Sequence, residues 1–173
     1  MNRRLVVVGA AAAALVTMAF VPTATAERGG RHLQDLRDAT AAYHDFDRAA
    51  DEGFTVVRDL AKLTCIDDSA GGMGTHYVLP SRLDAEISLL EPEILIYDET
   101  GDRPTLIAVE YLVRADVWHA AHGKQPPKQF GKKFTLVRAG NRYGLPDFYE
   151  QHVWLWKSNP AGLLQDWNPE VSC

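Results

Sequence analysis

The chain has 173 residues, of which 46% are hydrophobic and 24% are charged, and it contains two cysteines. This length fits one domain, and this composition excludes a disordered chain, a collagen-like repeat and a cysteine-dense scaffold. The formal net charge of −5 at pH 7 argues against a protein that gains affinity from a phosphate backbone. We therefore expect a globular protein without nucleic acid among its partners.

The N-terminus has the layout of a signal peptide. Two arginines precede an apolar run over residues 5–21, and residues 24–26 (Ala-Thr-Ala) place small side chains where signal peptidase reads them. The run has 17 residues, whereas a membrane-spanning helix needs ~20. We predict cleavage of residues 1–26, which leaves one secreted domain over residues 27–173 without stable membrane insertion. Its net charge becomes −7, because the removed segment carries two arginines and no acidic residue.

The two cysteines, Cys65 and Cys173, both lie in the part predicted to be exported. In an oxidising compartment an isolated pair is most simply a disulfide. Two free thiols, one of them catalytic, are the alternative, but no residue follows Cys173 to shape a pocket around it. We predict a disulfide that closes a loop of about 100 residues.

The first third of the predicted mature chain is helical. Apolar residues recur at helical spacing over residues 33–50, and Gly53 is a natural C-cap, so this stretch predicts one long amphipathic helix. Residues 54–63 fit either a short helix or a short strand. Residues 69–74 (Ser-Ala-Gly-Gly-Met-Gly) are typical of a loop, and a strand is expected over residues 75–79.

The second half is rich in short runs of β-branched and aromatic residues. Strands are predicted over residues 94–97, 105–114, 134–138 and 148–156. The tail over residues 159–173 contains two prolines, so we expect an irregular segment that packs on the body. This order predicts the α+β class, with one long N-terminal helix on a curved, mostly antiparallel sheet. In shape it resembles the cystatin-like and NTF2-like cone folds.

Strand alternation places three titratable side chains on the faces of the expected sheet. Glu110 shares its face with apolar neighbours, His76 shares one with Val78, and His152 shares one with Trp154. If these faces coincide, His76, Glu110 and His152 converge. Such a set suits Zn or Fe(II), and without a metal it suits general acid–base catalysis. The alternative is that each histidine is hydrogen-bonded within the sheet and Glu110 faces water or an arginine.

Aromatic residues of the C-terminal half predict a cavity for a small apolar or sugar-like ligand. We expect Trp154 to line it, together with Tyr77 and Met73 from the glycine-rich region. Packing within the core is the alternative for these side chains. No motif requires a cofactor, and a divalent metal is compatible with the two histidines and the glutamate.

Two further patterns, a histidine pair and a run of glycines, resemble binding motifs but do not predict a site. His119 and His122 have the i, i+3 spacing of metal ligands on a helix, but a glycine and a proline-rich loop follow them, so we predict an exposed loop. The glycines over residues 71–74 precede a strand and not a helix, which argues against a nucleotide site.

Several sequence blocks together resemble a family of secreted bacterial proteins of unknown function. These blocks are Cys65, Gly71-Gly-Met-Gly-Thr-His-Tyr-Val78, Val109-Glu-Tyr111, His152-Val-Trp-Leu-Trp156, Asn159-Pro-x-Gly162 and Trp167-Asn-Pro-x-Val-Ser-Cys173. The resemblance covers about residues 33–173. It implies export and a single compact domain, and it assigns no activity.

The first functional hypothesis is a secreted, disulfide-stabilised domain that binds a small ligand in an aromatic, histidine-lined cavity. The alternative is a small extracytoplasmic enzyme, metal-dependent in one version. In that enzyme His76 and His152 are ligands or acid–base groups, and Glu110 is a ligand or a base. A third hypothesis is an inhibitor that binds a partner through the loop around Pro126 and Pro127.

Overall fold

The computed structural model describes residues 24–173, so all but the last three residues of the predicted signal peptide lie outside the described part. Most strands form one sheet: β1 (Thr55–Val56), β2 (Cys65–Asp68), β3 (Gly71–Val78), β4 (Ile94–Asp98), β5 (Thr105–Arg114), β8 (Thr135–Val137) and β9 (Phe148–Val153). The order is β1-β3-β4-β5-β9-β8, β2 also pairs with β3, and every pairing is antiparallel. Two short strands, β6 (Lys128–Gln129) and β7 (Lys132–Lys133), form a separate hairpin.

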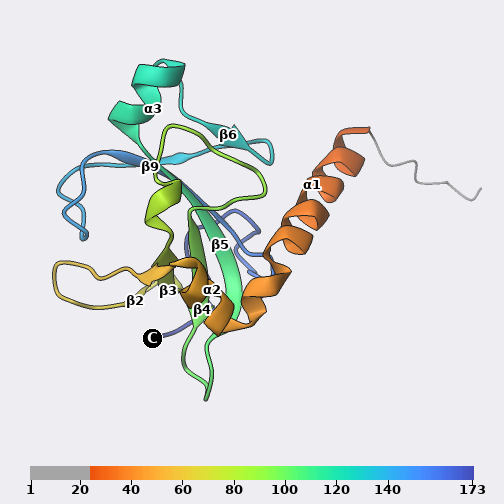
Figure 1. The fold of residues 1–173 in the computed structure, drawn as a ribbon, viewed down its shortest axis with the longest axis vertical. Coiled ribbons are helices and arrows are strands. Elements are labelled where there is room, and N and C mark those ends of the chain that lie inside the picture. The colour runs from red at the N-terminus through yellow and green to blue at the C-terminus, as the bar shows by residue number, and fades with distance from the viewer. Residues whose placement is uncertain (1–23) are drawn as a thin grey trace, which may run out of the picture.

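The helices of the described part are α1 (Ala24–Thr40), α2 (Phe46–Glu52) and α3 (Ala115–His122), with 3₁₀ turns η1 (Ala41–His44) and η2 (Pro80–Arg82). Figure 1 shows α1 along one side of the sheet and α3 at one end of it. No helix within residues 24–173 combines the length and apolarity that crossing a membrane requires. The predicted α+β class with an antiparallel sheet is confirmed.

The single helix expected over residues 33–50 is divided. The Thr40 hydroxyl donates a hydrogen bond of 2.8 Å to the Leu36 carbonyl in the last turn of α1. Asp45 then leaves the helical region and caps α2, because its carboxylate accepts a backbone N–H two residues later. Gly53 ends α2 in the left-handed conformation, as expected. The predicted length was wrong because the apolar stripe continues across a cap that starts a second helix.

The prediction of a loop over residues 69–74 was also wrong for residues 71–74, because β3 begins at Gly71. Gly72 forms an isolated β-bridge with Asn168 of the tail. A β-carbon on Gly72 would lie 2.8 Å from the carbonyl oxygen of Val171, which is closer than a side chain tolerates. The glycines therefore let the tail lie directly on the strand. Glycine in a strand often marks a place where another backbone segment approaches closely.

The exposed loop expected around His119 and His122 is the helix α3, so that prediction was wrong as well. The helix starts directly after β5, and Asp116 in its first turn is favourable near a helix N-terminus. Its C-cap is Gly123, and the two prolines come only afterwards. The glycine and prolines that argued against a helix thus lie at and after its C-terminal end.

The sheet has two unlike faces because neighbouring residues of a strand point to opposite sides. The face towards α1 and α2, here called the helix face, carries the larger core, which includes Leu95, Tyr97 and Tyr111. The opposite face, here called the tail face, carries a smaller core. The buried residues of that core are Ile94, Ile96, Ile107, Ala108, Trp154 and Val171.

The predicted disulfide between Cys65 and Cys173 is present, with its Cα atoms 5.5 Å apart. It joins the last residue of the chain to β2 across a sequence separation of 108 residues. The tail is irregular, as expected, and its Val171 is buried against the tail face. A disulfide is typical of proteins in oxidising compartments.

Candidate functional site

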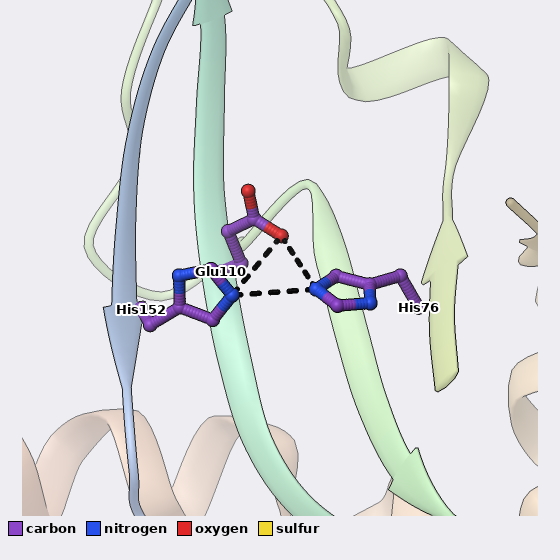
Figure 2. A group of neighbouring side chains, drawn as sticks. All are labelled: His76, Glu110 and His152. Carbon is purple, nitrogen blue, oxygen red and sulfur yellow. Dashed lines mark hydrogen bonds and ion pairs between the residues drawn. The ribbon is translucent and has the colours of Figure 1, made fainter. Parts of the chain in front are cut away.

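Three strands bring His76, Glu110 and His152 together on the tail face. Glu110 of β5 and His152 of β9 are direct partners in the register. His76 of β3 is the partner of Ile96 on β4, the strand between β3 and β5. Figure 2 shows the three side chains pointing toward one another, with both imidazoles turned to one carboxylate oxygen. The convergence that strand alternation predicted is therefore confirmed.

The three side chains form a tight, buried triangle. Nε2 of His76 lies 3.3 Å from Nε2 of His152 and 3.4 Å from Oε2 of Glu110. Nε2 of His152 lies 3.8 Å from the same oxygen. Each of the three residues is at most 3% exposed. Burying such groups is unfavourable unless they are paired with one another or bind an ion.

The dimensions of this triangle fit a metal centre. In a tetrahedral site with metal–ligand distances of ~2.0–2.1 Å, two ligand atoms lie ~3.3–3.4 Å apart. Two of the three separations match this value, and the third, at 3.8 Å, is a few tenths of an ångström longer. Three protein ligands leave a fourth position for water or another molecule, which is the arrangement of catalytic zinc sites.

Burial and neighbouring charges separate the protonation states of the two histidines. Burial, and then His152, lower the pKa of His76 to about 3, so this ring is neutral at pH 7. Burial alone would lower the pKa of His152, but Glu110, Asp166 and Glu150 together raise it to about 9. Burial raises the pKa of Glu110 well above its ordinary value, although His152 opposes the shift. Burial thus disfavours the charged form of His76, whereas the neighbouring carboxylates favour the charged form of His152.

Two acidic residues extend the cluster beyond the three predicted side chains. Oδ1 of Asp166 lies 3.6 Å from Nδ1 of His152, on the side of the ring that faces away from Glu110. Glu150, His152 and Asp166 form a second group whose candidate ligand atoms lie within 4.8 Å of one another. A carboxylate behind a metal-binding histidine orients its ring and raises its basicity.

The sequence already indicated that one of these two acidic residues, Glu150, lies near the cluster. Glu150 has the same strand parity as His152, so alternation already placed it on the same face. Asp166 belongs to the irregular tail, where no periodicity predicts the direction of a side chain. Only the folding of the tail over the sheet brings it to His152.

Two cavities of about 240 Å³ each adjoin the cluster. The first, here called the apolar cavity, is lined by aliphatic side chains that include Val57, Val78, Leu83, Ile94, Leu112 and Leu145. The second, here called the polar cavity because only it is lined by Asn141, Arg142 and His152, also has apolar residues in its lining: Ile66, Met73, Val137 and Trp167. The two cavities share His76, Glu110, Tyr143, Phe148 and Glu150. The cluster thus lies where an apolar and a polar space meet.

The residues predicted to bind a ligand are distributed over both faces. Met73 lines the polar cavity. Tyr77 packs edge-on against Phe46 on the helix face, away from His76. Trp154 is buried in the smaller core, where its indole N–H donates to the Gln165 carbonyl. Neither Tyr77 nor Trp154 lines either cavity, and the shared aromatic lining comes from Tyr143 and Phe148.

The other histidine pair lies apart from the cluster. Nε2 of His119 is 3.0 Å from the Tyr149 hydroxyl, and Nε2 of His122 is 2.9 Å from the Ala85 carbonyl. The two rings therefore have separate partners. Among the described residues, neither belongs to a group with metal-ligand spacing.

Comparison of the chain with protein-family models, with curated proteins and with solved structures gave no match. The resemblance to a family of secreted bacterial proteins and the likeness to cystatin-like or NTF2-like cones therefore stay predictions. Function has to be argued from the geometry of the site.

Proposed function

We propose that the chain binds one divalent metal ion through His76, Glu110 and His152, and that a small ligand occupies the remaining coordination position. The observation that carries this proposal is the buried triangle of two imidazole nitrogens and one carboxylate oxygen at tetrahedral spacing. Zinc is the first candidate, because imidazole and carboxylate at this spacing suit it, and Fe(II) is the second.

Two features of the surroundings support the metal proposal. Oδ1 of Asp166, 3.6 Å from Nδ1 of His152, lies on the side of the ring where metal-binding histidines have a carboxylate partner, although this distance is too long for a hydrogen bond. His76, neutral at pH 7, offers a lone pair without first losing a proton. An ion would also favour the ionised form of Glu110, which burial by itself disfavours.

Elemental analysis of the oxidised protein tests the proposal directly. We expect one equivalent of Zn or Fe in the wild type and none in a His76→Ala/His152→Ala double variant that keeps its fold by circular dichroism. The matched control is His119→Ala/His122→Ala, which removes the same two side chains elsewhere and should keep the ion. A wild type that takes up neither metal after incubation with each contradicts the proposal. So does a double variant that still binds one equivalent.

A second candidate function is metal-free acid–base catalysis by the same residues. The observation in its favour is the contact of two buried imidazoles with one carboxylate, at 3.3–3.8 Å, in surroundings that lower the pKa of His76 through burial and raise that of His152 through neighbouring carboxylates. Neighbouring groups whose pKa values are pushed apart can take the roles of base and acid. Elemental analysis separates the two candidates, because a bound ion would use both Nε2 atoms.

If no metal binds, NMR titration of the two imidazoles becomes the deciding experiment. The acid–base candidate expects His76 to stay neutral and His152 to stay protonated at pH 7. Two histidines that titrate together near pH 6.5 would contradict it.

We also propose that the site works outside the cytoplasm. The disulfide supports this, because such bonds persist in oxidising compartments. The test is the mass of the protein recovered from the exported fraction, which should correspond to a chain that begins at Glu27 and contains no free thiol. Recovery of the whole chain from the cytoplasm alone would contradict it.

A further inference from the structure

The apolar cavity adjoins the proposed metal site directly. It shares His76 and Glu110 with the polar cavity, and aliphatic side chains form most of the rest of its wall. A cavity that held only water beside an ion would be expected to present polar groups along its length, because each ordered water needs two to four polar partners. Here the polar partners are concentrated at the end where the cluster lies.

The outer part of the apolar cavity remains apolar. Leu83 and Leu145, which line it, are 46% and 42% exposed. Leu60, on the loop that contacts Gly144, is 71% exposed. Exposed apolar side chains that cluster around an opening mark ligand-binding grooves more often than ordinary surface. An apolar group could therefore enter from this side without passing charged residues of the lining.

Acidic residues dominate the inner end. Glu110, Glu150 and Asp166 are all near the proposed ion. Arg142, in the polar cavity, is already paired with Asp59 at 2.8 Å. With a divalent ion bound, the carboxylates of Glu110 and Asp166 already balance the charge of that ion, so a full negative charge on a ligand gains little there, whereas an uncharged oxygen-bearing head needs no such compensation.

We infer that the ligand is a small neutral amphiphile, with an aliphatic group in the apolar cavity and an uncharged carbonyl-type head at the metal ion. This inference rests on the proposed metal site. Each cavity, at about 240 Å³, is smaller than the ~300 Å³ at the lower end of drug-sized pockets, so the aliphatic group is limited to a few carbon atoms. The polar cavity, which adjoins the same cluster, leaves space for a substituent on the head.

A series of straight-chain primary alkyl carboxamides on the zinc-loaded, oxidised protein tests the inference by isothermal titration calorimetry. A carboxamide has no acidic proton near pH 7, so its carbonyl oxygen reaches the ion uncharged. We expect affinity to rise roughly fourfold per added methylene, and to stop rising when the cavity is full. The alkyl carboxylate of equal length, which offers a similar oxygen with a full negative charge, should bind more weakly than the carboxamide.

Two controls separate filling of the cavity from binding to the ion. A carboxamide with a terminal ammonium group should lose the gain from its chain, because the charge would be buried among aliphatic side chains. Leu112→Trp should fill the apolar cavity and abolish the dependence on chain length, with zinc content unchanged. Leu90→Trp, at a 45% exposed position outside the lining, should behave as the wild type.

The outcomes distinguish the two proposals. Zinc binding with an affinity that does not depend on chain length, or equal gains with the ammonium-terminated probe, would overturn the ligand inference and leave the metal site standing. Absence of zinc binding would overturn the proposed function, and the inference that rests on it would fail too. If Leu112→Trp does not fold, the chain-length series and the ammonium probe on the wild type still decide.

Discussion

The two faces of the central sheet are made by the same strands but contain different kinds of side chain. On the helix face Leu95, Tyr97 and Tyr111 are fully buried. Tyr97 packs against Phe46 of α2, whereas Tyr111 packs against Phe130 and Phe134, and both tyrosine hydroxyls donate to backbone carbonyls. On the tail face, His76 and Glu110 interrupt the aliphatic core. A sheet with helices on one face only can bury its stabilising core there and keep the other face for reactive groups.

The difference has a physical cause in desolvation. Burial of an apolar side chain contributes about 1.5–3 kcal/mol, whereas burial of an ionisable group is unfavourable unless its partners compensate. The helix face should therefore supply most of the free energy of unfolding, and the cluster on the tail face little or none of it. Four predictions follow from this contrast, in order of decreasing effect on stability.

Truncation on the helix face should have the largest effect. We expect Leu95→Ala to lower the free energy of unfolding by about 2–5 kcal/mol, because Leu95 is fully buried and a cavity would remain. Urea unfolding with the disulfide intact measures it. Leu90→Ala, at an exposed position, is the control and should change stability by less than about 0.5 kcal/mol. Equal losses in the two variants would refute the assignment of the main core to this face.

Removal of the disulfide should have the next largest effect and should act on the tail face. The Cys65→Ser/Cys173→Ser variant is expected to lose about 2–4 kcal/mol of stability, because the unfolded chain regains the freedom of a long loop. Hydrogen exchange should show loss of protection in β2 and the tail before the helix face. Protection lost first in α1 and α2 would contradict this picture.

Glu93 is a buried carboxyl outside the cluster, and its effect on stability can be compared with that of Glu110 inside the cluster. Burial raises the pKa of Glu93 to about 8, although its Oε2 accepts a hydrogen bond from the Leu112 N–H. The native state therefore holds a proton that the unfolded chain releases near pH 4.5. Stability should fall as the pH rises from 4.5 to 8, by a few kcal/mol.

Glu93→Gln tests this because it keeps the acceptor oxygen and cannot ionise. Unfolding measured at several pH values between 4.5 and 8 should show a flatter profile in the variant than in the wild type. The two proteins should have similar stability near pH 4.5, where the native carboxyl is protonated. Parallel profiles would mean that Glu93 does not lose its proton on unfolding.

The smallest effect on stability should come from Asp166, whose role is proposed to be the orientation of His152. We expect Asp166→Asn to change stability little and to weaken zinc binding by about 10–100-fold. Competition with a metal chelator measures the affinity. Asp51→Asn, an exposed change on α2, is the matched control. Unchanged zinc affinity in Asp166→Asn would remove Asp166 from the site.

Local pattern alone was sufficient for much of this protein. The β5 prediction over residues 105–114 matches the structure residue for residue. Strand parity predicted that His76, Glu110 and His152 converge if the faces of their strands coincide, and in the structure they do. The cysteine count predicted the disulfide. These features follow from the two-residue repeat of a strand and from redox chemistry, both of which are visible in a single sequence.

The remaining features depend on contacts between distant segments. The break before α2, the strand character of Gly71 and Gly72, and the approach of Asp166 to His152 all involve caps or tail contacts that periodicity does not encode. The cavities exist because the loops around Leu60 and Gly144 meet, with the Leu60 N–H donating to the Arg142 carbonyl. The sequence by itself determined which side chains of one strand face the same way. Only the tertiary structure decided their distances and the shape of the space beside them, because both depend on how loops and tail pack over the sheet.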